Sequence, residues 1–495
     1  MNRKAFDNDK YLSLQSEKIL ERINLFDNRL YLEFGGKLFD DNHASRVLPG
    51  FLPDIKVQML AKLKEKVEIV IVINANDIEA NKVRGDLGIT YDQEVLRLID
   101  AFRSIDLFVG SVVVTHYNQQ AATNAFKKRL EKLGLKVYRH YPIEGYPANV
   151  PHIISEEGFG KNEYIETQKP LIVVTAPGPG SGKMATCLSQ MYHDHKHGIK
   201  SGYAKYETFP IWNIPLKHPV NLAYEAATAE LDDVNIIDPF HLEAYGEAVV
   251  SYNRDADVFP VLKNIFEKIQ QESPYQSPTD MGVNMAGYCI VDNEAAIEAS
   301  NEEIIRRYFH ALVQQRLGNY DDSPVQKIEM VMNQANITAD DRKIVDIAEK
   351  KATATNEPAI AIELDDGRVV TGKTSTLFGA SAAALLNAIK ALGNIDEDLP
   401  LISRSVIEPV QKLKVEMLGN NNPRIHADEM LVMLSVSATT NPVAELALSQ
   451  LPKLKGCEVH STIILRREDE NIFGKLQMNL TCSPKFRTKK LYHKK

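Results

Sequence analysis

The chain alternates between two hydrophobic patterns over residues 57–175. Predominantly apolar runs, which are typical of strands buried on both faces, occur at residues 67–73, 107–114, 135–138 and 171–174. Between these runs, apolar side chains recur every three or four positions, as in an amphipathic helix; one example is Val95, Leu98, Ile99 and Phe102. Strands that alternate with helices predict an α/β fold in which mostly parallel sheets are covered by helices.

Short polar motifs predict where several helices begin. Thr90 and Ser300 each stand three residues before a Gln or Glu, which matches the capping box that satisfies free amides at a helix start. Asn441 directly before Pro442 is a second kind of start signal, because proline fits the first helical position. We therefore expect helices to begin at these three places.

Turn residues and composition divide the rest of the chain. The Ser- and Pro-rich segment 273–278 is typical of a linker, and residues 292–351 have an almost entirely helical pattern. Strand signals return in a hairpin at 359–364 and 368–371 and in closing strands at 458–465 and 472–480. We expect an N-terminal α/β region (1–272), a linker with a helical subdomain (273–352) and a C-terminal α/β domain (353–495).

Length and charge limit the classes of protein that fit. A chain of 495 residues is longer than one hydrophobic core usually serves, which supports a multi-domain protein. A net charge of −8 does not favour a nucleic-acid binder, which usually carries a basic face. No apolar run is long enough to cross a bilayer, so we expect neither nucleic acid nor membrane as a partner. A homo-oligomer is the general expectation for soluble proteins.

Cysteine usage bears on the compartment. The four cysteines are scattered and form no C-x-x-C pair, which favours a reducing compartment without disulfides or a zinc–thiolate site. The N-terminal residues also lack the apolar segment of a secretory signal. A cytoplasmic location is the resulting expectation.

A glycine-rich turn is the main candidate for chemistry. The strand at 171–174 runs into Gly178, Gly180, Ser181, Gly182 and Lys183, and a helix pattern follows. Glycines let backbone amides converge on an anion, a helix start adds free donors and partial positive charge, and a lysine adds a full charge. The segment predicts a phosphate-binding turn for a small anionic or phosphorylated ligand, such as ATP or another phosphate compound with Mg²⁺.

The turn departs twice from the consensus G-x-x-x-x-G-K-[ST]. Pro177 stands where the first glycine belongs, and Met184 replaces the hydroxyl residue that would hold Mg²⁺. Asp238, at the end of the apolar run 234–238, is the candidate metal ligand, because such enzymes need a carboxylate beside the loop. The alternative is a strand-end Asp before Pro239, an arrangement that is common in turns.

Residues 367–374 fit the same consensus letter for letter, from Gly367 to Thr374. Their middle residues, Arg-Val-Val-Thr, favour extended strand, and an Asp-Asp-Gly turn precedes them. We therefore interpret this segment as one arm of the predicted hairpin.

Polar and aromatic residues gather in an irregular stretch at 203–219, which contains the only tryptophan. Lys205, Glu207 and His218 are candidate acid, base or anion-binding groups, and Lys183 joins them as a candidate catalytic residue. The alternative is a rigid connection between sheet and helices.

Two segments carry highly specific strings. Residues 176–184 read Ala-Pro-Gly-Pro-Gly-Ser-Gly-Lys-Met, and residues 203–225 begin Tyr-Ala-Lys-Tyr-Glu-Thr-Phe-Pro-Ile-Trp. With them the whole chain resembles a bacterial protein family whose members have similar length and no assigned function. The resemblance implies a cytosolic bacterial protein with several α/β and helical parts, and it transfers no catalytic residue.

Three functional hypotheses fit these observations. The first is a nucleotide-dependent enzyme, a phosphotransferase or ATP-dependent ligase, with the 178–183 turn on phosphate. The second is a metabolic enzyme without nucleotide that holds an anionic substrate at the same turn. The third is a non-catalytic scaffold or ligand-binding protein.

Overall fold

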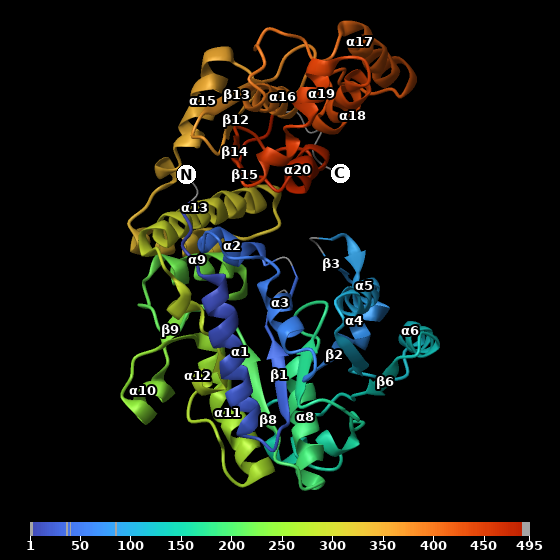
Figure 1. Ribbon diagram of the computed structural model, residues 1–495, viewed down its shortest axis with the longest axis vertical. Coiled ribbons are helices and arrows are strands. Elements are labelled where there is room, and N and C mark those ends of the chain that lie inside the picture. Colours follow the sequence, from blue (N-terminus) through green and yellow to red (C-terminus); the bar gives the residue numbers. More distant parts are fainter. Residues whose placement is uncertain (1–2, 36–37, 40, 85–86, 488–495) are drawn as a thin grey trace. The chain divides into compact units, whose positions relative to one another are not determined.

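The computed structural model describes residues 3–35, 38–39, 41–84 and 87–487, which divide into two compact units (Figure 1). The N-terminal unit comprises Arg3–Tyr224 and Asp233–Ser300, and the C-terminal unit contains Glu225–Asp232 and the chain from Asn301 onward. The boundary predicted after residue 272 falls inside the N-terminal unit. The predicted helical subdomain, 273–352, is shared between the two units.

A seven-stranded sheet with the order β11-β8-β1-β7-β2-β5-β6 forms the centre of the N-terminal unit. All of its strand pairs are parallel, which confirms the predicted sheet type. Its strands are β1 (Leu30–Phe34), β2 (Val67–Asn74), β5 (Phe108–Thr115), β6 (Lys136–Arg139), β7 (Leu171–Thr175), β8 (Gly202–Tyr206) and β11 (Gly282–Val283). Strand β8 corrects the prediction that residues 203–219 are irregular throughout, because residues 203–206 pair with β1 and in part with β11.

Helices cover both faces of this sheet (Figure 1). Successive side chains of a strand point to opposite faces. Tyr203 of β8 accordingly packs on Phe266 of one helix, whereas the Tyr206 hydroxyl lies 2.6 Å from that of Tyr11 on another helix. The main helices of the unit are α1 (Asn8–Asn24), α3 (Ile55–Lys62), α5 (Tyr91–Ser104), α6 (Ala121–Lys132), α8 (Lys183–Lys196) and α11 (Asn253–Gln270). The capping box predicted at Thr90 is present at the start of α5.

The strand order creates a switch point between the neighbours β1 and β7. From β1 the chain continues to β2 on one side, and from β7 it crosses to β8 on the other side. Connections that leave in opposite directions open a crevice at the carboxyl ends of the strands, which is where open α/β sheets bind ligands. The residues that follow β1, β7 and β8 therefore occupy the favoured position for a site.

The C-terminal unit is built on a mixed four-stranded sheet with the order β13-β12-β14-β15. The predicted hairpin is confirmed, because β12 and β13 are antiparallel neighbours, and β13 contains the predicted strand arm with the loop-like consensus. The strand predicted at 472–480 is wrong up to residue 478, because residues 472–475 belong to α20 (Arg467–Lys475) and the strand begins only at Asn479. Acidic residues at 468–470 favour the first turn of that helix. The strands are β12 (Ala359–Glu363), β13 (Val369–Lys373), β14 (Glu458–Ser461) and β15 (Asn479–Cys482).

Most of the remaining C-terminal chain is helical. Ser300 does not begin a helix as predicted, because it lies inside the first helix of this region. Asp292 caps that helix instead, accepting a hydrogen bond of 3.0 Å from the Ala295 amide. Asn441 caps its helix as predicted. The longer helices are α13 (Asn293–Leu317), α14 (Ser323–Ala335), α15 (Lys343–Thr355), α16 (Ala380–Leu392), α17 (Arg404–Lys412), α18 (Ala427–Ala438) and α19 (Pro442–Leu448).

Candidate functional site

The glycine turn joins β7 to α8 at the carboxyl edge of the large sheet. Gly180 and Gly182 have φ angles of 73° and 88°, in the left-handed region that favours glycine. Neighbouring strands hold the turn through its carbonyl groups: Thr115 Oγ1 donates to Ser181 O at 2.7 Å, and Asn74 Nδ2 donates to Gly180 O at 3.3 Å. The turn is therefore fixed from the β2 and β5 side.

Two members of the predicted turn face inward. The Ser181 hydroxyl is buried and donates to the Gly178 carbonyl at 2.6 Å, so it closes the turn upon itself. A Cβ atom at Gly178 would lie 2.3 Å from the Tyr91 hydroxyl oxygen, so glycine is required there for close packing. These two residues shape the turn, and Gly180 and Gly182 form its outward part.

The first turn of α8 presents free donors. Within the described chain, the amides of residues 182–185 have no hydrogen-bond acceptor. The helical ladder begins one residue later, where the Thr186 amide donates to the Gly182 carbonyl at 2.9 Å. Unpaired amides at a helix start carry the positive end of the helix dipole, so this position attracts an anion.

Lys183 adds a full positive charge beside these amides. Its side chain is only 15% exposed, and Nζ lies 3.9 Å from Glu33 Oε1 at the end of β1. The other Glu33 oxygen accepts a hydrogen bond of 2.7 Å from the Tyr203 hydroxyl of β8. The ammonium group therefore lies between the ends of β1 and β7, at the switch point of the sheet.

A second group of charges lies at the end of β8, and we call it the Lys205 cluster: Lys205, Glu207, Tyr252 and Asp255. Lys205 is the register partner of Glu33 on the neighbouring strand. Its ammonium nitrogen lies 2.6 Å from Glu207 Oε1, 2.6 Å from Asp255 Oδ2 and in contact with the Tyr252 hydroxyl. That hydroxyl also donates to Glu207 at 2.9 Å. The structure thus brings together the predicted candidates Lys205 and Glu207.

Burial and charge set the protonation of the cluster. Burial raises the pKa of Glu207, the Lys205 ammonium opposes this, and the Asp255 carboxylate adds to the rise. Burial by itself lowers the pKa of Lys205, but the adjacent Glu207, Tyr252 and Asp255 outweigh it and hold that pKa well above its usual range. One cation shared by two buried carboxylates makes Glu207 a suitable proton acceptor.

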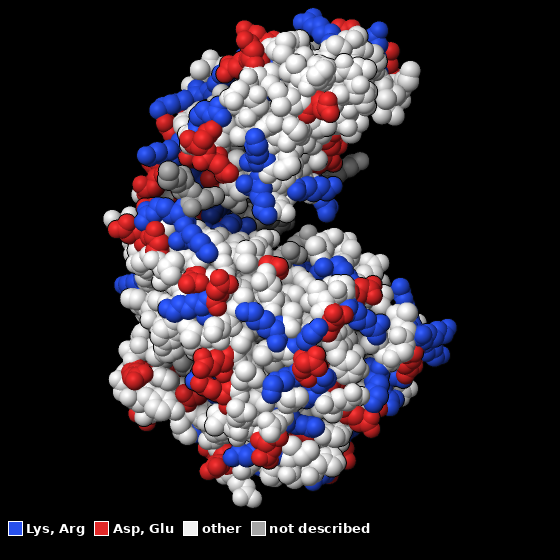
Figure 2. All heavy atoms as spheres, viewed as in Figure 1, with Lys and Arg blue, Asp and Glu red and all other residues white. Residues whose placement is uncertain are grey.

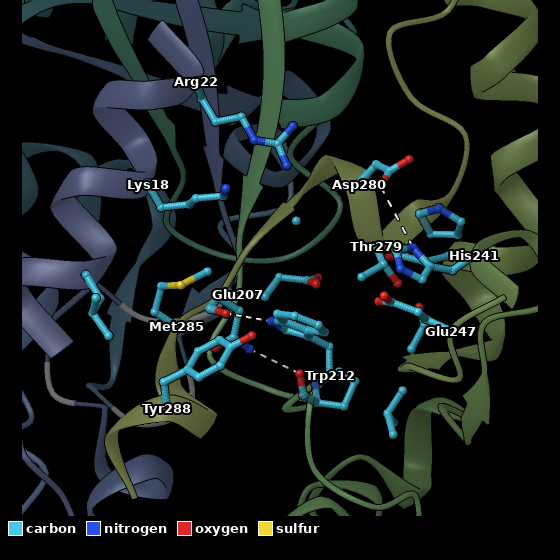
Figure 3. Close-up of a pocket in the computed structure, with 18 of the residues that line it drawn as sticks. Lys18, Arg22, Glu207, Trp212, His241, Glu247, Thr279, Asp280, Met285 and Tyr288 are labelled. Atoms are coloured by element: carbon cyan, nitrogen blue, oxygen red, sulfur yellow. Dashed lines mark hydrogen bonds and ion pairs between the residues drawn. The ribbon is translucent and has the colours of Figure 1, made fainter. Parts of the chain in front are cut away.

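A cavity of about 600 Å³ adjoins the cluster, and Glu207 and Asp255 are part of its lining (Figure 3). Trp212 also lines it, with the indole N–H donating to the Asn284 carbonyl at 2.7 Å. A volume of this size suits a small-molecule ligand. The carboxylates are therefore placed where a bound molecule could reach them.

Asp238 lies away from the main sheet. It follows β9 (Asn235–Ile237), which pairs with β10 (Val250–Tyr252) in a separate two-stranded sheet. Its carboxylate accepts hydrogen bonds from the Phe240 and His241 amides and from the amide and hydroxyl of Thr279. Asp238 therefore stands at the end of a strand before Pro239 and caps α10 (Pro239–Tyr245).

His218 contacts Asn293 and the first residues of a neighbouring helix. Its Nε2 lies 2.9 Å from Asn293 Oδ1, and its Nδ1 accepts a hydrogen bond of 3.3 Å from the Val220 amide. Burial lowers the pKa of this imidazole. The described contacts of His218 stabilise the start of α9 (Pro219–Ala227) and do not include the Lys205 cluster.

The described residues contain no group of three or more His, Cys, Asp or Glu side chains that could hold a metal ion. Among the helices described, none has the length and apolar character needed to cross a membrane. On the face shown in Figure 2, basic and acidic side chains are interspersed on each unit.

Sequence reasoning missed Glu33, Tyr252 and Asp255. Glu33 stands inside the apolar run Leu-Tyr-Leu-Glu-Phe, and a lone carboxylate in a strand pattern is the one local signal that could have indicated it. Tyr252 and Asp255 are distant in sequence from β8, so only the tertiary fold reveals their contacts.

Known proteins match along the whole chain. A family model described as domain of unknown function DUF1846, N-terminal, matches residues 4–336, and its C-terminal counterpart matches residues 340–492. The chain belongs to the DUF1846 family. UPF0371 proteins of Streptococcus pyogenes serotypes M5 and M18 are each 59% identical over 490 residues, covering 99% of this chain and 99% of the relative. A UPF0371 protein of Streptococcus uberis is 58% identical over 494 residues, with both chains fully covered.

These matches confirm the resemblance to a bacterial family of unknown function. The family models also describe two parts, with the division between residues 336 and 340. The glycine turn and the Lys205 cluster both lie in the part matched by the N-terminal DUF1846 model.

Proposed function

We propose that the carboxyl edge of the large sheet binds a phosphorylated small molecule, held by the turn at residues 178–183, and that Glu207, positioned by Lys205, accepts a proton beside it. The observation that carries this proposal is the free first-turn amides of α8 next to the Lys183 ammonium. The reaction class is phosphoryl transfer or ATP-dependent ligation, in which positioning and charge stabilisation supply most of the catalysis.

The contacts of Lys183 support this assignment. A distance of 3.9 Å to Glu33 is at the limit of an ion pair, and the Glu33 carboxylate also accepts the Tyr203 hydroxyl. Lys183 is therefore weakly held and can turn toward an incoming phosphate. Amide donors and an ammonium group together form charge-assisted hydrogen bonds with phosphate oxygens.

The Lys205 cluster supplies the second half of the proposal. Glu207 has a raised pKa and borders the cavity, as expected of a general base that takes a proton from an attacking hydroxyl or amino group. Lys205 holds the Glu207 and Asp255 carboxylates in place through two contacts of 2.6 Å. Lys205 therefore acts as a positioning residue in this proposal, and Glu207 acts as the base.

The metal requirement differs from that of the consensus loop. Met184 offers no hydroxyl, the Ser181 hydroxyl is directed at Gly178, and both Asp238 oxygens already accept hydrogen bonds. The proposed site therefore omits Asp238, and Mg²⁺ would reach it bound to the nucleotide.

A second candidate is an enzyme without nucleotide that holds a phosphorylated or carboxylated substrate at the same turn. The absence of a hydroxyl at Met184 and of a glycine at Pro177 favours this alternative. It uses the same amides, the same lysine and the same base. It differs in predicting that simple anions bind as tightly as nucleotides, because the adenosine part makes no contact that raises the affinity.

Thermal unfolding with Mg-ATP, ADP and inorganic phosphate tests the proposal. A ligand at 100 times its Kd stabilises the folded state by about 2.7 kcal/mol, which raises the melting temperature. We expect this rise in the wild type and in Lys196→Ala, which removes a lysine at the other end of α8, but not in Lys183→Ala. A rise that survives in Lys183→Ala, or no rise with any of the three ligands, would contradict the proposal.

A further inference from the structure

The cavity beside Glu207 has one wall that carries all of its lining lysine and arginine side chains and another that is acidic (Figure 3). One wall is a single face of α1, and its basic side chains Lys10, Lys18 and Arg22 all line the cavity. Lys18 and Arg22 extend from α1 toward the opposite wall, which carries Asp280 and Glu247. A cavity with charges separated in this way selects a ligand with two different ends.

No carboxylate of the described chain pairs with the Arg22 guanidinium group or with the ammonium group of Lys10, which is exposed. Lys18, by contrast, lies 2.9 Å from Glu21 of the same helix, and both of these side chains are substantially exposed. Glu17 and Glu21 also line this wall, and both are exposed. Arg22 is therefore the group best placed to receive an acidic substituent.

The opposite wall carries an excess of negative charge. The Asp280 carboxylate accepts the Tyr245 hydroxyl at 2.9 Å and lies 3.8 Å from His241 Nδ1. Glu247 is exposed, and Glu207 lies at the inner end with a single lysine shared between it and Asp255. An amino group on the ligand would therefore meet carboxylates on this side.

Aromatic side chains lie between the two walls. The rings of Trp212 and Tyr288 meet edge to face, with centroids 5.9 Å apart and planes at 68°. Both residues line the cavity, and Met285 lies beside Tyr288 (Figure 3). Such surfaces pack against apolar rings and attract cations to their faces.

We propose that this cavity binds a small amphoteric molecule with an acidic group on Arg22, an apolar or aromatic middle on Trp212 and an amino group on the Glu207 and Glu247 side. A simple anion would face the carboxylates, and a simple cation would leave Arg22 unpaired. The assignment of this molecule as the second substrate, with its amino group facing the base Glu207, rests on the proposed function. The binding of the amphoteric molecule in the cavity does not depend on that function.

Trp212 offers a direct readout, because it is the only tryptophan in the chain. The full chain is titrated with three probes that share one ring: para-(aminomethyl)benzoate, which has both charged ends, benzylamine, which has only the amine, and para-toluate, which has only the acid. We expect the amphoteric probe to change Trp212 fluorescence at a concentration roughly tenfold lower than either single-charge probe. Equal affinities for all three probes, or no response to any, would overturn the proposal.

Two variants locate the acidic end. Arg22→Gln should weaken the amphoteric probe roughly tenfold and leave benzylamine unchanged. Arg103→Gln is the control, since Arg103 is an exposed arginine outside the cavity and lies in the last turn of α5, just as the half-buried Arg22 lies in the last turn of α1. Unaltered binding in Arg22→Gln, with an unchanged emission spectrum of the ligand-free protein, would refute the assignment of that group.

The phosphate site at the glycine turn and the ligand site in the cavity can be tested independently of each other. Lys183→Ala should abolish the phosphate response and leave probe binding at Trp212 intact. If phosphate stabilises the protein but no probe binds, the inference about the cavity is wrong and the proposed function stands. If the probes bind as expected but phosphate has no effect, the cavity is a ligand site and its role as a second-substrate site is wrong.

Discussion

The Lys183 ammonium nitrogen lies 3.9 Å from Glu33 Oε1, whereas Lys205 lies 2.6 Å from Glu207. Two lysines at the carboxyl edge of the large sheet are thus held with different strength. The loosely held lysine is the one beside the free amides of α8, and the tightly held lysine is buried among carboxylates. Lys183 can therefore turn to bind an anion, whereas Lys205 holds the neighbouring carboxylates in place.

Replacing Glu33 should improve anion binding. Glu33→Gln removes a negative charge near Lys183 and keeps a hydrogen-bond acceptor for Tyr203. A change of about 1 kcal/mol, the Coulomb energy of two unit charges about 4 Å apart in water, would tighten phosphate binding roughly fivefold by calorimetric titration. Glu131→Gln, which removes an exposed carboxylate paired with Lys127, is the control. Weaker phosphate binding in Glu33→Gln would show that the Lys183 contact positions the lysine instead of restraining it.

Removing Lys205 should destabilise the N-terminal unit. Lys205→Met leaves the carboxylates of Glu207 and Asp255 buried without a counter-charge, which costs about 3 kcal/mol or more. Urea unfolding followed by Trp212 fluorescence reports on this unit, because Trp212 lies within it. The double variant Lys205→Met/Glu207→Gln should recover part of the loss. A loss no greater than that of the exposed Lys132→Met would contradict the buried-cluster description.

His140 should make the N-terminal unit sensitive to acid. Burial lowers the pKa of His140 to about 4, below its unfolded value, so the unfolded state binds the proton more readily. The stability that His140 contributes is therefore complete above about pH 6.5 and is lost as the pH falls toward 4. Between pH 7 and 5 this amounts to about 2 kcal/mol of unfolding free energy.

The same urea measurement at the two pH values checks this expectation. His140→Gln should flatten the pH dependence, while His195→Gln, at an exposed position of α8, should keep the wild-type slope. An identical slope in His140→Gln would assign the acid sensitivity to other groups.

The turn should tolerate a side chain at Gly180 at the cost of backbone strain alone. Gly180 has a φ of 73°, and a Cβ atom there would meet no atom within 4 Å. Gly180→Ala is therefore expected to lower the unfolding free energy by about 1–2 kcal/mol, and Gly180→Asn by less, because Asn enters the left-handed region more readily. Equal losses in the two variants would indicate a steric clash.

Hydrophobic pattern alone predicted β2, β5, β6 and β7, because their apolar runs have no helical periodicity. It missed β1 and β8, which are the two strands that carry Glu33 and Lys205. Charged residues interrupt the strand pattern at the same places where they build the site. Local sequence signals and the global fold thus disagree where charged side chains are buried at the carboxyl edge of the sheet.

One prediction of where a helix begins also failed because it used only neighbouring residues in the sequence. Ser300 and Asp238 both follow rules that operate within a few residues, but only tertiary structure decides which rule applies. Asp292 caps α13 upstream of Ser300, and Asp238 caps α10 while also binding Thr279, which is distant in sequence. The fold class and the glycine turn were predictable, whereas the partners of Lys205 and the cavity required the folded chain.

The most direct test of the central claim is diffraction from crystals grown with tungstate, a phosphate analogue with a strong anomalous signal. We expect an anomalous peak within hydrogen-bond distance of the first-turn amides of α8, with Lys183 Nζ turned from Glu33 toward it. A turn that stays empty while tungstate binds at other basic positions would contradict it.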